Sequence, residues 1–496
     1  MKYVAGLDNG GTVIKAALFS LDGRQVGKAS RSTDLITPQP GWTERDMDVM
    51  WAQNAACLKE VIATTGVKPE EIAGVAVCGH GKGLYPWGKD GKPAYNGIIS
   101  TDNRAWREVD KWKADGTHES QYEKLCQQLM PCQPLPILAW FKEHNRKVYD
   151  NIKYAFSCYD YIRFMLTGEA NIEATAGSGS ALMNVRDANY DKDMLKAFGL
   201  EEAYDMLPPL RYSSDLCGKV TKKAAEETGL LEGTPVAGGL FDIDGCAIAM
   251  SVLEQFDMCT ITGTWTINEF ISKKPYLKTA IAMNSLYAIP GFYLIEESSS
   301  TGAGCLEWVI DNVFPPNSSY KELDTLVASL APEKSDVYFL PFLQGSNRHP
   351  LAKASWVGLT SFHSRADMLR SVYEGAAYSA KQHIDKLLSV RDRPKALRMA
   401  GGAANSPLWV QMFADILNLP IETVTGVSEL GALGAAMSSA VAAGLFKDYH
   451  EACTAMVRIG KAVEPDKSKV GIYADKYAKY DAVCGALDTI WDKFEV

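Results

Sequence analysis

Short apolar segments alternate with amphipathic stretches along the chain. Residues 4–7 are apolar, and an extended apolar pattern resumes at residues 14–19 after the turn signal Asn9-Gly10-Gly11. Residues 47–63 have the spacing of a helix, and residues 72–78 form an uninterrupted apolar run that is typical of a buried strand. Alternating strands and helices predict an α/β fold.

The opening pattern occurs a second time, about half the chain later. Residues 258–262 and 265–271 predict two strands joined by Gly263-Thr264, just as Gly11-Thr12 lies at the tip of the first hairpin. Two similar halves predict two related lobes that face one another, with a chance repeat of common turn residues as the alternative.

The junction between the halves is expected near residues 245–257, a stretch that ends in a polar break at residues 254–257. A predicted strand at residues 236–240 and a predicted helix at residues 242–253 precede it. We therefore expect an N-terminal lobe of residues 1–246 and a C-terminal lobe of residues 247–496.

Composition narrows the class of protein. A hydrophobic fraction of 47% is typical of a globular chain, and 60 acidic against 51 basic residues argue against a nucleic-acid binder, which needs clustered cations. No apolar run is long enough to span a bilayer, and Asp8 interrupts the N-terminus before a signal-like segment forms, so we expect no membrane partner. The 11 cysteines lack a CxxC pair, which favours reduced thiols and a cytoplasmic location. The seven histidines form no HxxxH pair, so the sequence gives no support for a zinc site.

Two turns could hold phosphate. In the segment from Asp8 to Thr12, glycine backbone N–H groups can approach an anion closely, Thr12 adds a hydroxyl donor, and Lys15 follows. Asp8 could hold Mg²⁺ through water. Gly263-Thr264 is the second such turn, and a triphosphate bound between lobes needs donors from both. The alternative for each is an ordinary tight turn.

A third loop could hold a base or a ribose. A predicted strand runs into Gly401-Gly402, and a helix follows with Ser406 as N-cap and Pro407 at its first position. Bare glycine backbone lets a flat ring lie against it, although an ordinary strand–helix connection has the same pattern. Residues 83–89 fit GxxxxGK, but Asp90 follows where a P-loop has Ser or Thr, and Gly302-Ala303-Gly304 lacks the third glycine of a dinucleotide fingerprint.

Asp242 is the candidate general base. It lies between a strand end and a helix start, where the helix dipole favours an ionised carboxylate that can take the proton of an attacking hydroxyl. A simple N-cap is the alternative role, and Asp244 is the rival residue. We favour Asp242 because ligands gather at strand ends in α/β sheets.

Polar groups for a sugar are predicted in two further loops. His80 and Lys82 lie in a glycine-rich loop after the strand at residues 72–78, and Asp102 lies in a polar turn. Hydroxyl recognition rests on such hydrogen-bonding groups in fixed positions. The alternatives are a mobile turn with a solvated lysine and, for Asp102, a helix N-cap with Arg104 on a wet helix face.

The motifs together resemble the FGGY family of carbohydrate kinases over nearly the whole chain. The segments that carry the resemblance are residues 7–12, 233–242, 261–264, 339–346, 400–406 and 429–436. The resemblance implies two actin-like (ribonuclease H-like) lobes with ATP, Mg²⁺ and sugar in a central cleft. It implies that Asp8 lies near the metal and that Asp242 is the general base that deprotonates the sugar hydroxyl. It also implies that residues 429–436 form a helix that connects the lobes. It implies nucleotide contacts for Gly11, Thr12, Lys15, Gly263, Thr264, Gly401, Gly402 and Asn405.

Within the family, residues 38–47, 81–84, 238–242 and 306–308 resemble L-xylulose and 3-keto-L-gulonate kinases. The resemblance implies phosphorylation of a ketopentose or keto-sugar acid, with His80, Lys82, Asp102 and Asp242 at the substrate. His80 departs from the pattern, because such relatives carry Gln there. The alternatives are a kinase for D-xylulose, erythritol or glycerol, and a non-catalytic ATP-binding switch. A homodimer is a possible assembly.

Overall fold

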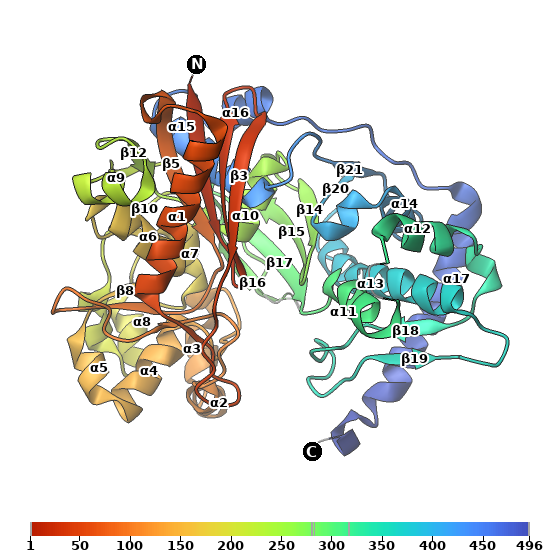
Figure 1. Cartoon of the computed structure of the whole chain (residues 1–496). Coiled ribbons are helices and arrows are strands. Elements are labelled where there is room, and N and C mark those ends of the chain that lie inside the picture. The colour runs from red at the N-terminus through yellow and green to blue at the C-terminus, as the bar shows by residue number, and fades with distance from the viewer. Residues whose placement is uncertain (1, 279–280, 282, 316–317, 495–496) are drawn as a thin grey trace.

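The computed structural model describes residues 2–278, 281, 283–315 and 318–494, and two sheet-containing lobes stand side by side in it (Figure 1). The sheet of the N-terminal lobe has the strand order β11-β12-β5-β1-β2-β3, with β13 paired to β5. Its strands are β1 (Tyr3–Asn9), β2 (Val13–Ser20), β3 (Gln25–Ser32), β5 (Ile72–Gly79), β11 (Leu216–Lys219), β12 (Pro235–Ala237) and β13 (Leu240–Phe241).

The sheet of the C-terminal lobe has the order β16-β17-β15-β14-β20-β21. Its strands are β14 (Met258–Thr262), β15 (Thr266–Ser272), β16 (Met283–Leu286), β17 (Tyr293–Ser299), β20 (Leu397–Ala400) and β21 (Ile421–Thr423). Short pairs lie outside both sheets: β4 (Glu44–Arg45) with β7 (Gly97–Ile98), β6 (Tyr85–Gly88) with β8 (Ile152–Phe156), β9 (Ile172–Glu173) with β10 (Leu210–Arg211), and β18 (Tyr338–Leu340) with β19 (Ser355–Val357).

The two main sheets share one topology. In each, a hairpin supplies the first two strands, β1–β2 or β14–β15, and the first strand of the hairpin then pairs in parallel with a later strand, β5 or β20. The hairpin tips lie between Asn9 and Val13 in one lobe and between Thr262 and Thr266 in the other. Both Gly-Thr pairs therefore occupy equivalent turns, as the repeated sequence pattern predicts.

Three helices cover the outer face of the N-terminal sheet: α1 (Met47–Thr65), α6 (Cys158–Thr167) and α9 (Lys222–Thr228). α1 begins where the Asp46 side chain accepts from the Val49 N–H, and it ends at Gly66, whose φ of 68° is left-handed. This is the usual pairing of an acidic N-cap with a glycine C-terminus. The apolar side of α1 packs with β1, β2 and β5 in one core.

A middle layer of helices lies between the two sheets and holds the lobes together. It comprises α10 (Asp242–Ala249), α15 (Leu430–Ala442) and α16 (Tyr449–Met456). One hydrophobic core joins these helices to residues from both sheets, including Val4 of β1 and Ile271 of β15. The contact of α15 with β1 is very close: a Cβ placed on Gly6 would lie 1.8 Å from the carbonyl oxygen of Ala432.

α15 comes from the C-terminal half of the chain but packs on β1 and β5 of the N-terminal sheet. The chain therefore returns across the boundary expected at residues 246 and 247. That boundary stays a prediction along the sequence, and in space the middle layer belongs to both lobes.

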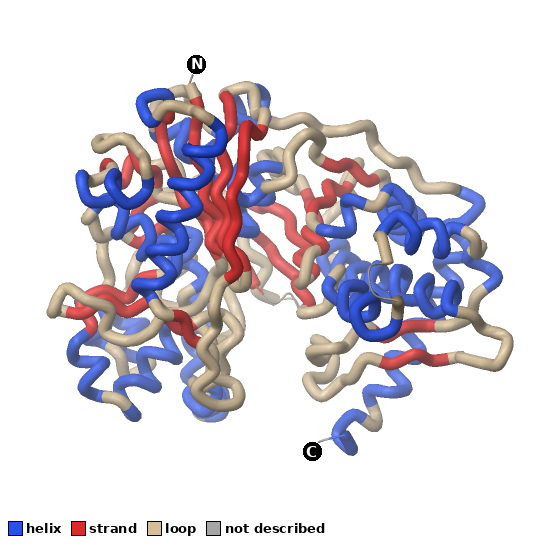
Figure 2. Tube along the Cα trace, viewed as in Figure 1, coloured by secondary structure: helices blue, strands red, loops and turns tan. Residues whose placement is uncertain are grey.

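The outer side of the C-terminal lobe is mostly helical (Figure 2). Its helices are α11 (Gly304–Val313), α12 (Tyr320–Ala328), α13 (Arg365–Leu388), α14 (Pro407–Leu417) and α17 (Lys467–Asp488). α13, α14 and α17 pack with β20 and β21 around a second core, which includes Leu397 and Tyr480.

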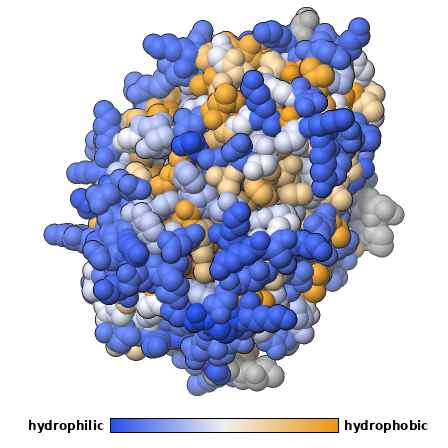
Figure 3. Space-filling model, turned by 90° about the vertical axis from the view of Figure 1, so that its left-hand side faces the viewer, coloured by the Kyte–Doolittle hydropathy of each residue, from blue (hydrophilic) through white to orange (hydrophobic). Residues whose placement is uncertain are grey.

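A helical subdomain extends from the far end of the N-terminal lobe. It contains α2 (Trp106–Ala114), α3 (Thr117–Leu125), α4 (Pro134–His144), α5 (Arg146–Asn151) and α8 (Lys192–Ala197). The short helix α7 (Ala174–Gly179) packs instead on β13 and β16. Trp112, Leu138 and Phe198 belong to the subdomain's own core. The side of the molecule that carries these helices shows mostly polar side chains in its lower half and a band of apolar ones above (Figure 3). Among the helices of the described residues, none combines the length and the apolar character needed to cross a membrane.

Candidate active site

The first predicted phosphate turn lies against the start of α15. Asp8 is near the end of β1, opposite Lys15 on β2 and Cys78 on β5. A Cβ placed on Gly431 would lie 2.8 Å from Oδ2 of Asp8, so the helix backbone reaches this carboxylate. Burial raises the pKa of Asp8, while the Lys15 ammonium pulls it down. The site therefore holds a carboxylate that a nearby cation would stabilise.

Lys15 pairs with the first residue of the segment 429–436, which the sequence marked as a connecting helix. Its Nζ lies 3.0 Å from Oε2 of Glu429, and Nζ of Lys28 lies 2.7 Å from Oε1 of the same residue. Burial lowers the pKa of Lys15, but the Glu429 and Asp8 carboxylates outweigh that effect and the pKa is raised overall. Lys15 is therefore a firmly charged group that lies between two carboxylates.

Three backbone segments meet in the C-terminal lobe. The β14–β15 turn closes with the Gly263 N–H donating to the Trp265 carbonyl at 2.9 Å, and the Gly304 N–H donates to the Gly263 carbonyl at 3.4 Å. Gly401 has a φ of 91°, and a Cβ on it would lie 2.4 Å from the Thr262 carbonyl oxygen. The turn with Thr264 and the loop after β20 are thus in contact, as a shared nucleotide site requires.

The loop after β20 has the predicted capping. The 3-10 segment η4 (Gly402–Asn405) leads to Ser406, whose side chain accepts from the Trp409 N–H at the start of α14. Sequence reasoning missed the third segment, residues 302–304, because it tested them only against a dinucleotide fingerprint. Their glycine spacing, at the start of α11, was the available signal.

Asp242 is the first residue of α10, after the N-cap residue Phe241, and it is half-buried. Its Oδ1 accepts the Ile243 N–H at 2.8 Å. Burial raises its pKa well above the usual range, and the Asp8 carboxylate adds to this, whereas Lys82 lowers it. The sequence led us to expect a carboxylate kept ionised by the helix dipole. In the structure, burial and a second acid oppose that effect.

Asp244, the rival residue, has a different environment. It is fully buried, and its Oδ1 accepts the Ala288 N–H at 3.0 Å. Ala288 follows β16 of the other lobe, so this bond joins α10 to the C-terminal sheet. The Asp244 side chain therefore helps to hold the lobes together.

Sequence reasoning also missed Glu296 of β17. Glu296 is 3% exposed, and its carboxylate raises the pKa of Asp242. Its signal was a charge inside an otherwise buried strand.

His80 lies beneath its loop, with 5% of its surface exposed. Its Nδ1 is 3.1 Å from the Gly81 carbonyl oxygen and its Nε2 is 2.7 Å from the Tyr85 hydroxyl. Both ring nitrogens are therefore engaged with protein groups, and the ring supports the loop. Lys82 is half-buried and has a left-handed φ of 61°. Its ammonium is close enough to Asp242 to lower the pKa of that carboxyl.

The burial of His80 predicts an acid-sensitive fold. Burial lowers its pKa to about 4, with Arg45 contributing. The unfolded chain takes up a proton near pH 6.5 and the folded chain does not, so stability should fall as the pH falls from about 6.5 toward 4. Between about pH 7.5 and pH 5, His80→Gln should lose about 2 kcal/mol less unfolding free energy than the wild type. Urea denaturation at both pH values measures this, and equal losses in the two proteins would contradict it.

Asp102 is likewise buried, with 3% of its surface exposed. Oδ2 accepts from the Thr43 N–H at 2.7 Å, and the Arg104 backbone and guanidinium supply three further donors at 2.9 Å. These four donors match the acceptor capacity of a carboxylate. Arg104 is not on a wet helix face: its guanidinium lies 4.2 Å from the centre of the Trp42 ring and 5.3 Å from that of Trp140. Asp102 therefore holds Arg104 in an aromatic cage, and its contact with the sugar stays a prediction.

The chain matches known proteins in two consecutive segments, one for each lobe. Residues 3–249 match the N-terminal domain of the FGGY family of carbohydrate kinases, and residues 258–443 match the C-terminal domain of that family. The chain is 34% identical to an L-xylulose/3-keto-L-gulonate kinase of Escherichia coli (strain K12), over 98% of this chain and 97% of that protein. It is also 34% identical to a probable L-xylulose kinase of Pasteurella multocida (strain Pm70), over 98% of this chain and 99% of that protein.

A solved structure agrees with the fold. The ligand-bound xylulose kinase from Lactobacillus acidophilus matches with a TM-score of 0.91 at 22% identity, and the match covers 100% of both chains. The α/β architecture with two actin-like lobes, expected from the sequence, is confirmed.

Proposed function

Because the chain belongs to the FGGY family of carbohydrate kinases, we propose that it transfers the γ-phosphoryl group of ATP to a hydroxyl of L-xylulose or 3-keto-L-gulonate. The family and the named relatives make the chain an ATP-dependent sugar kinase. The sugar is the proposed part. The observation that carries it is the 34% identity, over nearly the whole chain, to kinases named for these substrates.

Asp242 is the proposed base. It would take the proton of the sugar hydroxyl that attacks the γ-phosphorus, which is the role of an aspartate in phosphoryl transfer. Its raised pKa gives it a higher proton affinity than an exposed aspartate has. The Lys82 ammonium opposes that shift.

Asp8 is the proposed residue on the metal side. Its half-buried carboxylate has a raised pKa, and its charge raises the pKa of Asp242, so the two acids fit a divalent cation that prefers oxygen ligands. Mg²⁺, when bound, would supply positive charge to the phosphate oxygens. Around it we place the phosphates between two turns, Gly11 and Thr12 with Lys15 on one side and Gly263 and Thr264 on the other.

The adenosine end is proposed at Gly401, Gly402 and Asn405. The contact of Gly401 with the β14–β15 turn supports one continuous surface for base, ribose and phosphates. Closure of the lobes would exclude water and so limit hydrolysis of ATP.

The sugar end is proposed at Lys82. In this arrangement His80 supports the glycine-rich loop through its contact with Tyr85, and Asp102 fixes the Arg104 guanidinium in its aromatic cage. A cationic side chain next to the base suits a keto-sugar, and it suits the carboxylate of a keto-sugar acid more strongly.

Lys82→Gln tests this assignment. Loss of a charged hydrogen bond costs about 1.5–3 kcal/mol, so we expect kcat/KM to fall roughly 10- to 100-fold, with the larger loss for 3-keto-L-gulonate. Steady-state kinetics on both sugars measures it, and Lys196→Gln on the exposed face of α8 is the matched control. Equal kcat/KM in Lys82→Gln and wild type would remove Lys82 from the site.

A substrate panel tests the function as a whole. Coupled ADP-release assays with L-xylulose, 3-keto-L-gulonate, D-xylulose, erythritol, glycerol and no sugar should give the highest kcat/KM for one of the first two. A higher value for another polyol would overturn the proposed sugar and leave the kinase chemistry. Nucleotide binding without release of ADP on any sugar of the panel would favour the non-catalytic switch.

A further inference from the structure

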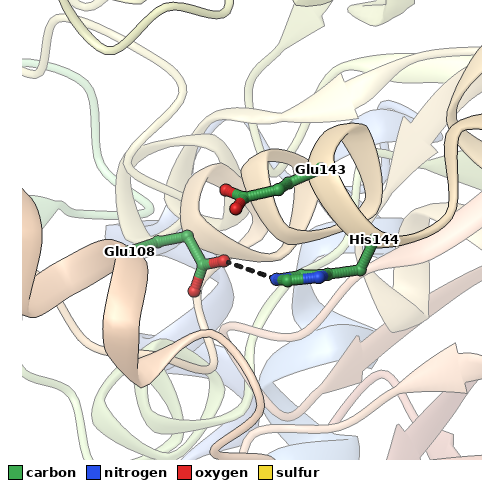
Figure 4. Close-up of side chains that lie close together, drawn as sticks. All are labelled: Glu108, Glu143 and His144. Carbon is green, nitrogen blue, oxygen red and sulfur yellow. Dashed lines mark ion pairs between the residues drawn. The ribbon is translucent and has the colours of Figure 1, made fainter.

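Three potential metal ligands meet in the helical subdomain, away from the residues placed in the active site. Glu108 lies on α2, and Glu143 and His144 are the last two residues of α4 (Figure 4). One ligand atom from each lies within 4.8 Å of the other two, and Nε2 of His144 is 3.6 Å from Oε1 of Glu108. The ligands come from two helices far apart in sequence, which is why a search for HxxxH did not find them.

Glu108 gives a second observation that points to a ligand. Only 8% of the residue is exposed, and its Oε2 is buried without a hydrogen-bond partner among the described residues. A buried carboxylate oxygen without a partner is costly, and a bound cation removes that cost.

The cluster borders a pocket of about 480 Å³, so a cation can reach it. Arg107, Lys111 and Lys142 line the same pocket and would repel a cation if their charges pointed into the cluster. Two of them are engaged elsewhere: Nζ of Lys142 lies 2.6 Å from Oε1 of Glu202, and the Arg107 guanidinium lies over the Trp106 ring.

We propose that Glu108, Glu143 and His144 bind one divalent transition-metal cation of the Zn²⁺ class. One imidazole nitrogen and two carboxylates suit Zn²⁺, whereas Mg²⁺ and Ca²⁺ prefer oxygen ligands alone. Zn²⁺ takes its ligands at about 2.0–2.2 Å, so the three groups must draw together from their present separation. Glu143 and His144 are exposed and can rotate, while Glu108 is fixed. The remaining position is open to solvent.

A cation here would join α2 to the end of α4. α2 begins two residues after Arg104, so the joint would brace the turn that Asp102 and Arg104 form. A ligand that binds the folded chain and not the unfolded chain raises the melting temperature.

The test is calorimetric titration of Zn²⁺ into the full, tag-free chain, with excess Mg²⁺ present to fill oxygen-only sites. The wild type should bind one Zn²⁺, and Glu108→Gln and His144→Gln should each weaken that binding at least tenfold. His450→Gln is the matched control, because His450 is an exposed histidine paired with one acid, Glu254, at 3.1 Å. It should bind Zn²⁺ as the wild type does.

Two further readouts separate a metal site from a folding defect. Co²⁺ should give visible absorption bands in the wild type that His144→Gln lacks, and Zn²⁺ should raise the melting temperature of the wild type but not of His144→Gln. His144 is exposed, so this variant should fold even if Glu108→Gln does not. Equal Zn²⁺ affinity in wild type and His144→Gln, or no saturable binding by the wild type, would overturn the proposal.

Discussion

Asp242→Asn is expected to lower kcat by roughly 10²–10⁴-fold, the range found when a general base is removed. Asparagine keeps the size of the side chain and the acceptor for the Ile243 N–H, but it cannot take a proton. Folding should not suffer. Burial and the Asp8 carboxylate make the ionised side chain costly in the folded state, so a neutral residue should melt at the same temperature or higher near neutral pH. Coupled ADP-release assays and thermal melting measure the two effects.

Asp244→Asn is the matched control, because it alters an aspartate two residues away on the same helix. Its carbonyl oxygen can still accept the Ala288 N–H, so we expect kcat within about tenfold of the wild type. If Asp242→Asn turns over at a near-normal rate with normal folding, the base assignment is wrong. A large loss in Asp244→Asn together with normal turnover in Asp242→Asn would transfer the role to Asp244.

Gly6→Ala is expected to have the largest effect on stability. The new Cβ would lie 1.8 Å from the Ala432 carbonyl oxygen, a separation that no pair of heavy atoms tolerates without moving α15 off β1. Overpacking a rigid backbone contact costs about 3 kcal/mol or more. Because domains are stable by only about 5–15 kcal/mol, much of the chain should be recovered unfolded or melt far below the wild type. Chemical denaturation and soluble yield measure this.

Gly471→Ala is the control for that prediction. Gly471 lies inside α17, and nothing comes within 4 Å of a Cβ placed there. Alanine favours a helix by about 0.5–1 kcal/mol over glycine, so this variant should be slightly more stable. Equal stability of Gly6→Ala and wild type would show that α15 does not rest on β1 as described.

Features that are set by residues close together in the sequence could be predicted. The sequence predicted the two hairpins with Gly-Thr at their tips and the N-cap of α14 at Ser406, and the structure has all three. The sugar-contact roles of Asp102 and His80 stay predictions, because a sequence does not show that these side chains turn inward onto protein partners such as Tyr85 and Arg104. Asp102 is saturated by Arg104 and Thr43, and a carboxylate that looks free in a sequence shows nothing of such donors.

Long-range pairing decides the roles of other residues, which the sequence names without their partners. Glu429 gains its importance from Lys15 and Lys28, some 400 residues away along the chain. Asp244 and Ala288 meet only because the two lobes meet. The pattern of apolar residues predicts which elements form, but not which polar groups they bring together. The site roles of Asp242 and the nucleotide loops therefore stay predictions until the variants are measured.

The position of α15 has a consequence for synthesis on the ribosome. The first sheet is complete once residue 241 has been made, but the helix that covers its inner face is translated about 190 residues later. Until then the nascent chain exposes an apolar surface around β1 and β5, where Val4 and Ala76 will later be buried. The first half of this polypeptide cannot mature alone while it is being made, and it must wait for its own C-terminal segment or be shielded by a chaperone.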